Sequence, residues 1–184
     1  MSTSRKRWTA AEMDALPVDR LRHEIIDGER CDTPPPSQRH QQAVLRLMML
    51  LLPYCDLIRA DLLFAPGAVK FSEFDQVQPD LFVLPRTDEG RLATQFADVG
   101  RLLLAVEVLS PSSSHMDRVT KRSLYQANGV PEYWVVDIET RMVERWTTVS
   151  EKAELVSDTL AWQPVAEHDA ALAIDLATYF RSID

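Results

Sequence analysis

The chain has 184 residues, enough for one domain with a substantial core, and 46% apolar with 26% charged residues is ordinary for a globular protein. Its 20 basic and 28 acidic residues give a net charge of −8, which excludes a broad basic surface that holds nucleic acid without sequence preference. A local basic groove, or an acidic site that binds duplex through a divalent metal, remains compatible with this charge.

The cysteines and the apolar segments exclude further classes. Cys31 and Cys55 lie far apart and lack CxxC spacing, so they indicate neither a zinc site nor a disulfide framework. The basic N-terminus is not followed by an apolar signal core, and the longest apolar run, 47–53, is too short to cross a bilayer. We therefore expect a cytoplasmic protein with free thiols and no membrane partner.

The N-terminal third predicts a helix, a hairpin and a second helix. Thr9 and Glu12 have the spacing of a capping box, which predicts a short helix over Ala10–Leu16. Residues 22–27 and 29–32 are expected to form a hairpin about Gly28. On this fragment alone, Glu24 is best interpreted as an exposed edge-strand acid.

The next segment predicts a long, largely buried helix. Three prolines at 34–36 indicate an extended linker, Ser37 is a candidate N-cap, and a helix is expected from Gln38 to about Leu52, ending at Pro53. Its second half is apolar on nearly every face, which favours burial by a sheet and by another layer or subunit. His40 lies in the first turn, where a histidine is usually a surface residue.

The middle and end of the chain predict a sheet. Strands are expected over 57–65 and 68–71 around a Pro-Gly turn, over 77–84 as an edge or bulged strand because of Pro79, and over 102–109 as a central buried strand. A charged insertion occupies 85–100. A helix over 117–128 and a hairpin of 133–138 with 142–148 follow, and 172–176 with 179–180 are expected to pack on the core. The order predicts a mixed α/β (α+β) domain over 1–184, built on one sheet.

Two acids in apolar segments need a chemical explanation. Asp80 and Glu107 are expected on core strands, where an ionised carboxylate is costly unless it is paired or bound to metal. A shared hard cation such as Mg²⁺ would relieve their repulsion, activate water and screen a phosphodiester. A structural ion pair with Arg101 or Arg118 is an equally good interpretation of the pattern alone.

The pattern Pro79-Asp80 followed by Glu107-Val108-Leu109 resembles the PD-(D/E)XK nuclease signature. More narrowly, the chain resembles the Uma-two family of endonuclease-like proteins, once known only as a domain of unknown function. The matching pieces span about Leu21 to Trp146 and are His23 to Gly28, His40, Val77 to Leu81, Val106 to Ser112, Asp117, Lys121, Tyr125 and Gly129 to Asp137.

The resemblance implies a restriction-endonuclease-like core over about 21–148, with a central mixed sheet flanked by helices, and Mg²⁺-dependent hydrolysis of DNA, with Mn²⁺ as a substitute. Asp80 and Glu107 would be the metal ligands. Leu109 stands where the broader signature has lysine, so the catalytic lysine would be Lys121, which shares a helix face with Tyr125 at i, i+4 spacing. The alternative for Lys121 is a surface pair with Asp117. Glu24, His40 and Tyr125 would support the site.

Two other interpretations compete with the nuclease. Ser110 to His115 places hydroxyls beside a histidine, but no GxSxG elbow accompanies them, so a flexible loop is the better interpretation. A catalytically inactive relative that keeps the fold to bind nucleic acid or protein is the competing hypothesis, mildly favoured by the net charge. The apolar helix over 44–52 and the hairpin over 133–146 leave spare apolar surface, which predicts a homodimer.

Overall fold

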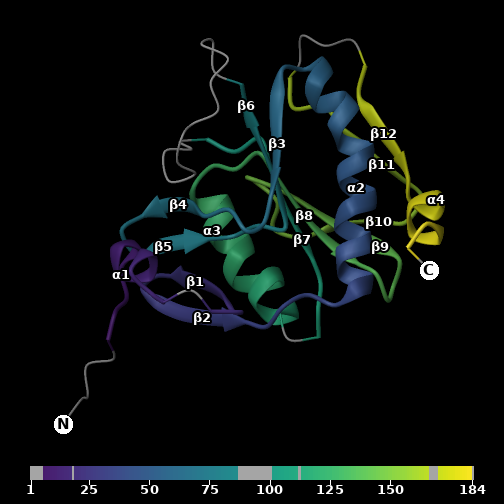
Figure 1. Cartoon of the computed structure of the whole chain (residues 1–184). Coiled ribbons are helices and arrows are strands. Elements are labelled where there is room, and N and C mark those ends of the chain that lie inside the picture. Colours follow the sequence, from purple (N-terminus) through teal and green to yellow (C-terminus); the bar gives the residue numbers. More distant parts are fainter. Residues whose placement is uncertain (1–5, 18, 87–100, 112, 166–169, 184) are drawn as a thin grey trace.

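The computed structural model describes residues 6–17, 19–86, 101–111, 113–165 and 170–183. A six-stranded mixed sheet of order β10-β9-β8-β7-β6-β3 forms its centre, beside a four-stranded antiparallel sheet, β2-β1-β5-β4, and a two-stranded sheet, β11-β12 (Figure 1). The strands are β1 Arg22–Ile26, β2 Glu29–Thr33, β3 Ala60–Phe64, β4 Val69–Ser72, β5 Asp75–Val77, β6 Leu81–Pro85, β7 Leu104–Val108, β8 Glu132–Asp137, β9 Met142–Thr147, β10 Glu154–Val156, β11 Thr159–Trp162 and β12 Leu172–Asp175. The helices are α1 Ala10–Asp14, α2 Gln38–Leu57, the π-helical segment η2 Met116–Lys121, α3 Arg122–Ala127 and α4 Leu176–Arg181.

The central strand β7 shows how the sheet separates two cores. Successive side chains of a strand point to opposite faces, so Leu104, Val106 and Val108 join the core that includes α2 and the C-terminal elements. Ala105 joins the second core, which includes α3 and residues of β4 and β5. Glu107 follows the alternation of Ala105 and therefore faces α3. The expectation of a central strand buried on both faces is confirmed.

The helix α2 lies across one face of the six-stranded sheet (Figure 1) and runs to Leu57, so the expected stop at Pro53 is wrong. Proline removes one backbone donor and crowds the preceding turn. Because Pro53 has no N–H, the carbonyl of Met49, one turn earlier, loses its hydrogen-bond partner. Both residues are exposed, so water can bind this carbonyl. Tyr54 and Cys55, both buried, hold the last turn against the core.

The proline at 79 divides one expected strand into two. Val77 ends β5 in the four-stranded sheet, and Leu81 begins β6 in the six-stranded sheet. A single strand over 77–84 is therefore wrong, because the chain leaves one sheet at Gln78–Pro79 and enters the other after Asp80. Likewise β3 and β4, expected on either side of the Pro66-Gly67 turn, belong to different sheets.

Most other elements are confirmed. Thr9 and Glu12 form both bonds of the capping box, and Ser37 accepts from the His40 amide as the N-cap of α2. The β1-β2 and β8-β9 hairpins have the expected antiparallel pairing. The helix after β7 begins as η2 before α3, and Gly129 ends it with φ of 68°. The charged insertion, apart from Pro85 and Arg86, lies outside the described residues.

The C-terminal segment packs on the core as expected, through Leu176, Tyr179 and Phe180 of α4. The β11-β12 hairpin that precedes α4 was not expected from the sequence. None of the helices in the described part of the chain combines the length and apolar character needed to cross a membrane.

Candidate active site

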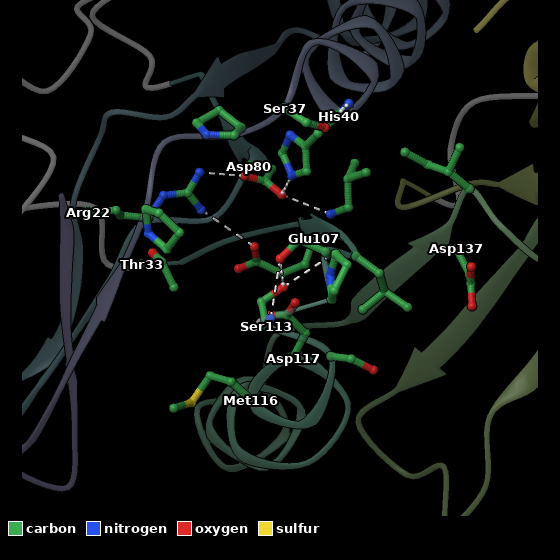
Figure 2. A pocket seen from close by; sticks show the side chains of 18 of the residues that line it. Arg22, Thr33, Ser37, His40, Asp80, Glu107, Ser113, Met116, Asp117 and Asp137 are labelled. Atoms are coloured by element: carbon green, nitrogen blue, oxygen red, sulfur yellow. Dashed lines mark hydrogen bonds and ion pairs between the residues drawn. The ribbon is translucent and has the colours of Figure 1, made fainter. Parts of the chain in front are cut away.

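Five elements meet around a pocket of about 520 Å³. Arg22 and Glu24 come from β1, His40 from the first turn of α2, Asp80 from just before β6, Glu107 from β7, and Asp117 with Lys121 from η2. The side chains of Arg22, Asp80, Glu107 and Asp117 converge in the middle of Figure 2. Tyr125 of α3 contacts Glu107 as well. All the residues that the sequence predicted for the site therefore lie at or next to this pocket.

Asp80 receives three donors at its carboxylate. Arg22 Nη2 donates to Oδ1 at 2.7 Å, while Oδ2 accepts from His40 Nε2 at 3.0 Å and from the Val108 amide at 2.8 Å. Burial by itself would raise the pKa of Asp80, but the hydrogen bond from His40 and the charge of Arg22 outweigh it and hold that pKa well below its ordinary value. Asp80 is therefore ionised at neutral pH, and His40 Nε2 carries a hydrogen because an ionised carboxylate only accepts.

Glu107 is held mainly through one oxygen. Its Oε1 accepts from Lys121 Nζ at 2.9 Å and from the Tyr125 hydroxyl at 3.2 Å, while Oε2 lies 3.9 Å from Arg22 Nη1. Burial raises the pKa of Glu107 well above its ordinary value; the charge of Lys121 opposes this, and the charge of Asp80 adds to it. The inward orientation expected for Lys121 and Tyr125 from their spacing is confirmed.

Lys121 is enclosed by three carboxylates. Its Nζ lies 2.9 Å from Glu24 Oε1, 2.9 Å from Glu107 Oε1 and 3.6 Å from Asp117 Oδ1. Burial would lower the pKa of Lys121, but the three negative charges, led by Glu107, raise it above its ordinary value. The i, i+4 pair of Lys121 with Asp117 is present, but its expected place on the surface is wrong, because the two side chains are each only 2% exposed.

Glu24 and His40 are buried, contrary to the surface positions expected from their fragments. Strand β1 pairs with β2 on one side and β5 on the other, so Glu24 is not on an edge, and its Oε1 accepts from the Gln78 amide at 2.7 Å. The first turn of α2 points at Asp80 rather than at solvent, which leaves His40 8% exposed. His40 Nδ1 has no hydrogen-bond partner among the described residues.

The site carries more negative charge than its side chains neutralise. Glu24, Asp80, Glu107 and Asp117 are each at most 3% exposed, and among the described Lys and Arg residues their ion-pair partners are Lys121 and Arg22. Four carboxylates against two cations leave an excess of two negative charges if all the acids are ionised and His40 is neutral. Such an excess in a buried site calls for protons or a bound cation. Burial raises the pKa of Asp117 in the same direction as that of Glu107.

The composition of the site fits a hard divalent cation. Its anionic groups are carboxylates, the ligands that Mg²⁺ and Mn²⁺ prefer. Within the described residues, no group of three His, Cys, Asp or Glu side chains is arranged as a complete metal-binding set. Mg²⁺ does not require one, because it keeps several waters and binds through one or two carboxylates. Glu24, Asp80, Glu107 and Asp117 all line the pocket, and among them Asp80 and Glu107 are the two that contact Arg22.

Arg22 is the site residue that the sequence interpretation missed. The expected ion-pair partners of the acids were Arg101 or Arg118, but Arg118 pairs with Asp137 at 2.9 Å and with Glu144. Arg22 precedes Glu24 by two residues on the same strand, so the alternation that places Glu24 on one face also places Arg22 there. That alternation was the feature of the sequence from which Arg22 could have been predicted at the site.

The mixed sheet flanked by helices, with paired acids and a lysine at its centre, defines a nuclease-like α/β protein. The chain belongs to the Uma2 family, whose model, described as "Putative restriction endonuclease", matches residues 10–177. A crystal structure of "a putative nuclease belonging to DUF820 from Anabaena variabilis ATCC 29413" is similar, with a TM-score of 0.78 over 96% of this chain and 99% of that chain at 20% identity. That likeness establishes the fold alone. No curated protein matched the chain.

Proposed function

We propose that this protein is a metal-dependent endonuclease that hydrolyses phosphodiester bonds of DNA. The observation that carries the proposal is the placement of Asp80 and Glu107 in one pocket, in contact with a common arginine and with Lys121 held on Glu107. The excess negative charge of this buried cluster supports a cation there, and membership of the Uma2 family supports nuclease chemistry.

Each side chain has a role in this proposal. Asp80 and Glu107 would hold Mg²⁺, which when bound supplies an activated water and screens the phosphodiester charge. Lys121, fixed by Glu107 and Glu24, places a positive charge where it can orient the attacking water. His40 orients Asp80 through Nε2, and Tyr125 orients Glu107 through its hydroxyl.

The test is cleavage of plasmid DNA by purified protein with Mg²⁺ or Mn²⁺. Asp80→Asn and Glu107→Gln keep the side-chain shape but remove the anionic ligand, so each should lower the rate by more than about 100-fold, beyond the effect typical of residues that only support a ligand. Circular dichroism would confirm that the variants fold. Cleavage by either variant at the wild-type rate would refute the assignment.

One observation favours a second candidate, a nuclease-fold protein that binds nucleic acid or another protein without catalysis. Arg22 already supplies Asp80 with a counter-ion at 2.7 Å, so the acid is compensated without metal. The net charge of −8 also argues against strong duplex binding. Calorimetric titration with Mn²⁺ separates the candidates, since the binding module should show no heat that depends on Asp80 and Glu107.

We also propose that the protein works as a homodimer in the cytoplasm. The outer face of α2 carries Leu45, Met49 and Leu52, which are 40%, 57% and 48% exposed, and a second copy of the same helix could cover them. Both cysteines are free, as expected for a reducing compartment, and burial raises the pKa of the Cys55 thiol to about 12, which keeps it unreactive.

A further inference from the structure

The two carboxylates of the proposed metal site each have one oxygen that is already fully engaged. Asp80 Oδ2 accepts from both His40 and the Val108 amide, and Glu107 Oε1 accepts from both Lys121 and Tyr125. Because a carboxylate oxygen offers about two lone-pair sites, Asp80 Oδ1 and Glu107 Oε2 are the oxygens through which the two acids would hold a shared cation.

Arg22 lies against these two remaining oxygens. Its Nη2 is 2.7 Å from Asp80 Oδ1 and its Nη1 is 3.9 Å from Glu107 Oε2, and Figure 2 shows the guanidinium reaching toward both carboxylates. Nη1 also donates to the Gln78 carbonyl at 3.1 Å. A divalent cation on the same two oxygens would lie beside the guanidinium, and the two like charges would repel each other.

Arg22 is placed so that it can leave. It is the first residue of β1, and its side chain is 20% exposed and lines the pocket, whereas the side chains of Lys121, Glu107 and Asp80 are at most 3% exposed. A phosphodiester that enters the pocket would offer the guanidinium the planar, bidentate contact that arginine makes with phosphate oxygens.

We propose that Arg22 is a displaceable counter-ion: it holds Asp80 and Glu107 in the metal-free protein, yields them to the divalent cation, and then binds the phosphate of the DNA. The proposal rests on the proposed metal-dependent nuclease function. It follows that Arg22 weakens metal binding to the free protein and that DNA, by drawing Arg22 away, strengthens it. Metal and DNA binding are therefore coupled through one side chain.

The first test is calorimetric titration of Mn²⁺ into the wild-type protein and the variant Arg22→Ala. Arg22→Ala should bind Mn²⁺ at least about fivefold more tightly, the lower end of typical coupling factors. Arg22→Lys should fall between the two, because one ammonium group cannot span both carboxylates. Arg118→Ala removes the same charge from the same pocket, but Arg118 pairs with Asp137 and Glu144, so its Mn²⁺ affinity should change by less than about twofold.

The outcomes separate this proposal from the proposed function. If the wild-type protein binds Mn²⁺ and Arg22→Ala binds it equally or more weakly, the counter-ion role is overturned while the metal site stands. If neither binds Mn²⁺ although both fold by circular dichroism, the metal site itself fails, and the counter-ion role with it. Arg22→Gln, which keeps more of the apolar stem, replaces Arg22→Ala if the alanine variant does not fold.

The second test measures the coupling. Ca²⁺ is titrated into each protein with and without a short duplex oligonucleotide. The duplex should raise the Ca²⁺ affinity of the wild-type protein by a larger factor than that of Arg22→Ala, while Arg22→Ala binds the duplex more weakly at saturating Ca²⁺. An equal enhancement in both proteins would overturn the phosphate-binding step.

Discussion

At the scale of single residues, the site is organised around acids that are expensive to bury. Lys121 is the shared ion-pair partner of Glu24, Glu107 and Asp117, so one positive charge faces three carboxylates that are nearly excluded from water. A core optimised only for stability would replace several of these groups with apolar ones. The arrangement is therefore better explained by a binding or catalytic role than by stability.

This leads to a prediction for Glu107→Gln in metal-free protein. The folded-state pKa of Glu107 is raised, so the folded protein binds that proton more tightly than the unfolded chain, and wild-type stability falls as pH rises toward the folded pKa. Glutamine carries no such charge and should stabilise the protein at pH 8, with a gain that shrinks as the pH is lowered through the raised pKa. Urea unfolding at several pH values measures it.

The matched control is Glu132→Gln. Glu132 is also on a central strand, but both of its oxygens are bound by Arg145, at 2.8 Å and 2.9 Å. Its removal should lower stability, because Arg145 loses its partner. A loss of stability in Glu107→Gln equal to that of the control would identify Glu107 as an ordinary structural ion-pair acid.

The sequence predicted which acids belong to the site better than it predicted their surroundings. Asp80 and Glu107 could be named because a charged group stands out within an apolar run, and Lys121 could be named from the resemblance to the Uma-two family. The burial of Glu24 and His40 could not, since it depends on β5 pairing with β1 and on the direction in which α2 begins. An arginine at the end of a strand is common. The part of Arg22 in the site is visible only from the carboxylates that it contacts in the structure.

At the scale of elements, two of the errors come from prolines. Local preferences predicted that Pro53 ends a helix and that Pro79 distorts one strand. The tertiary structure instead continues α2 through Pro53 and uses Pro79 to move the chain between sheets. Packing decides both outcomes, because the residues after each proline are buried in the core. Elements with strong local signals, such as the capping box at Thr9 and the β8-β9 hairpin, were predicted correctly.

The proline in α2 gives a prediction of its own. Pro53→Ala restores a backbone donor within the helix and removes the steric crowding of the preceding turn, so it should stabilise the protein by about 1–3 kcal/mol. Part of this gain is offset by the greater freedom of the unfolded alanine chain. Denaturant unfolding measures the change. Pro35→Ala, in the extended segment before α2, serves as the control and should bring no comparable gain.

At the scale of the whole molecule, the site depends on two sheets meeting. Arg22 and Glu24 belong to β1 of the four-stranded sheet. Glu107 belongs to β7 of the six-stranded sheet, and Asp80 directly precedes β6 of that same sheet. The connection at Gln78–Pro79 joins the two sheets and carries its own contacts to the site, through the Gln78 amide to Glu24 and the Gln78 carbonyl to Arg22. The two proposed metal ligands lie on or next to the six-stranded sheet, and the docking of the four-stranded sheet adds Arg22 and Glu24 to the charge cluster.

The face of α2 that is turned away from the sheet gives the last prediction, a homodimer. Leu45, Met49 and Leu52 follow helical spacing and form an exposed apolar stripe, so two antiparallel copies of α2 could cover each other about a twofold axis. Light scattering at micromolar concentration should report twice the 20.9 kDa mass of the chain.

Met49→Glu places a charge within the stripe and should give a monomer. Val149→Glu alters a more exposed apolar residue, 87% exposed, outside α2, and should leave the dimer intact. A wild-type monomer, or a dimer that survives Met49→Glu, would contradict the assignment of this face.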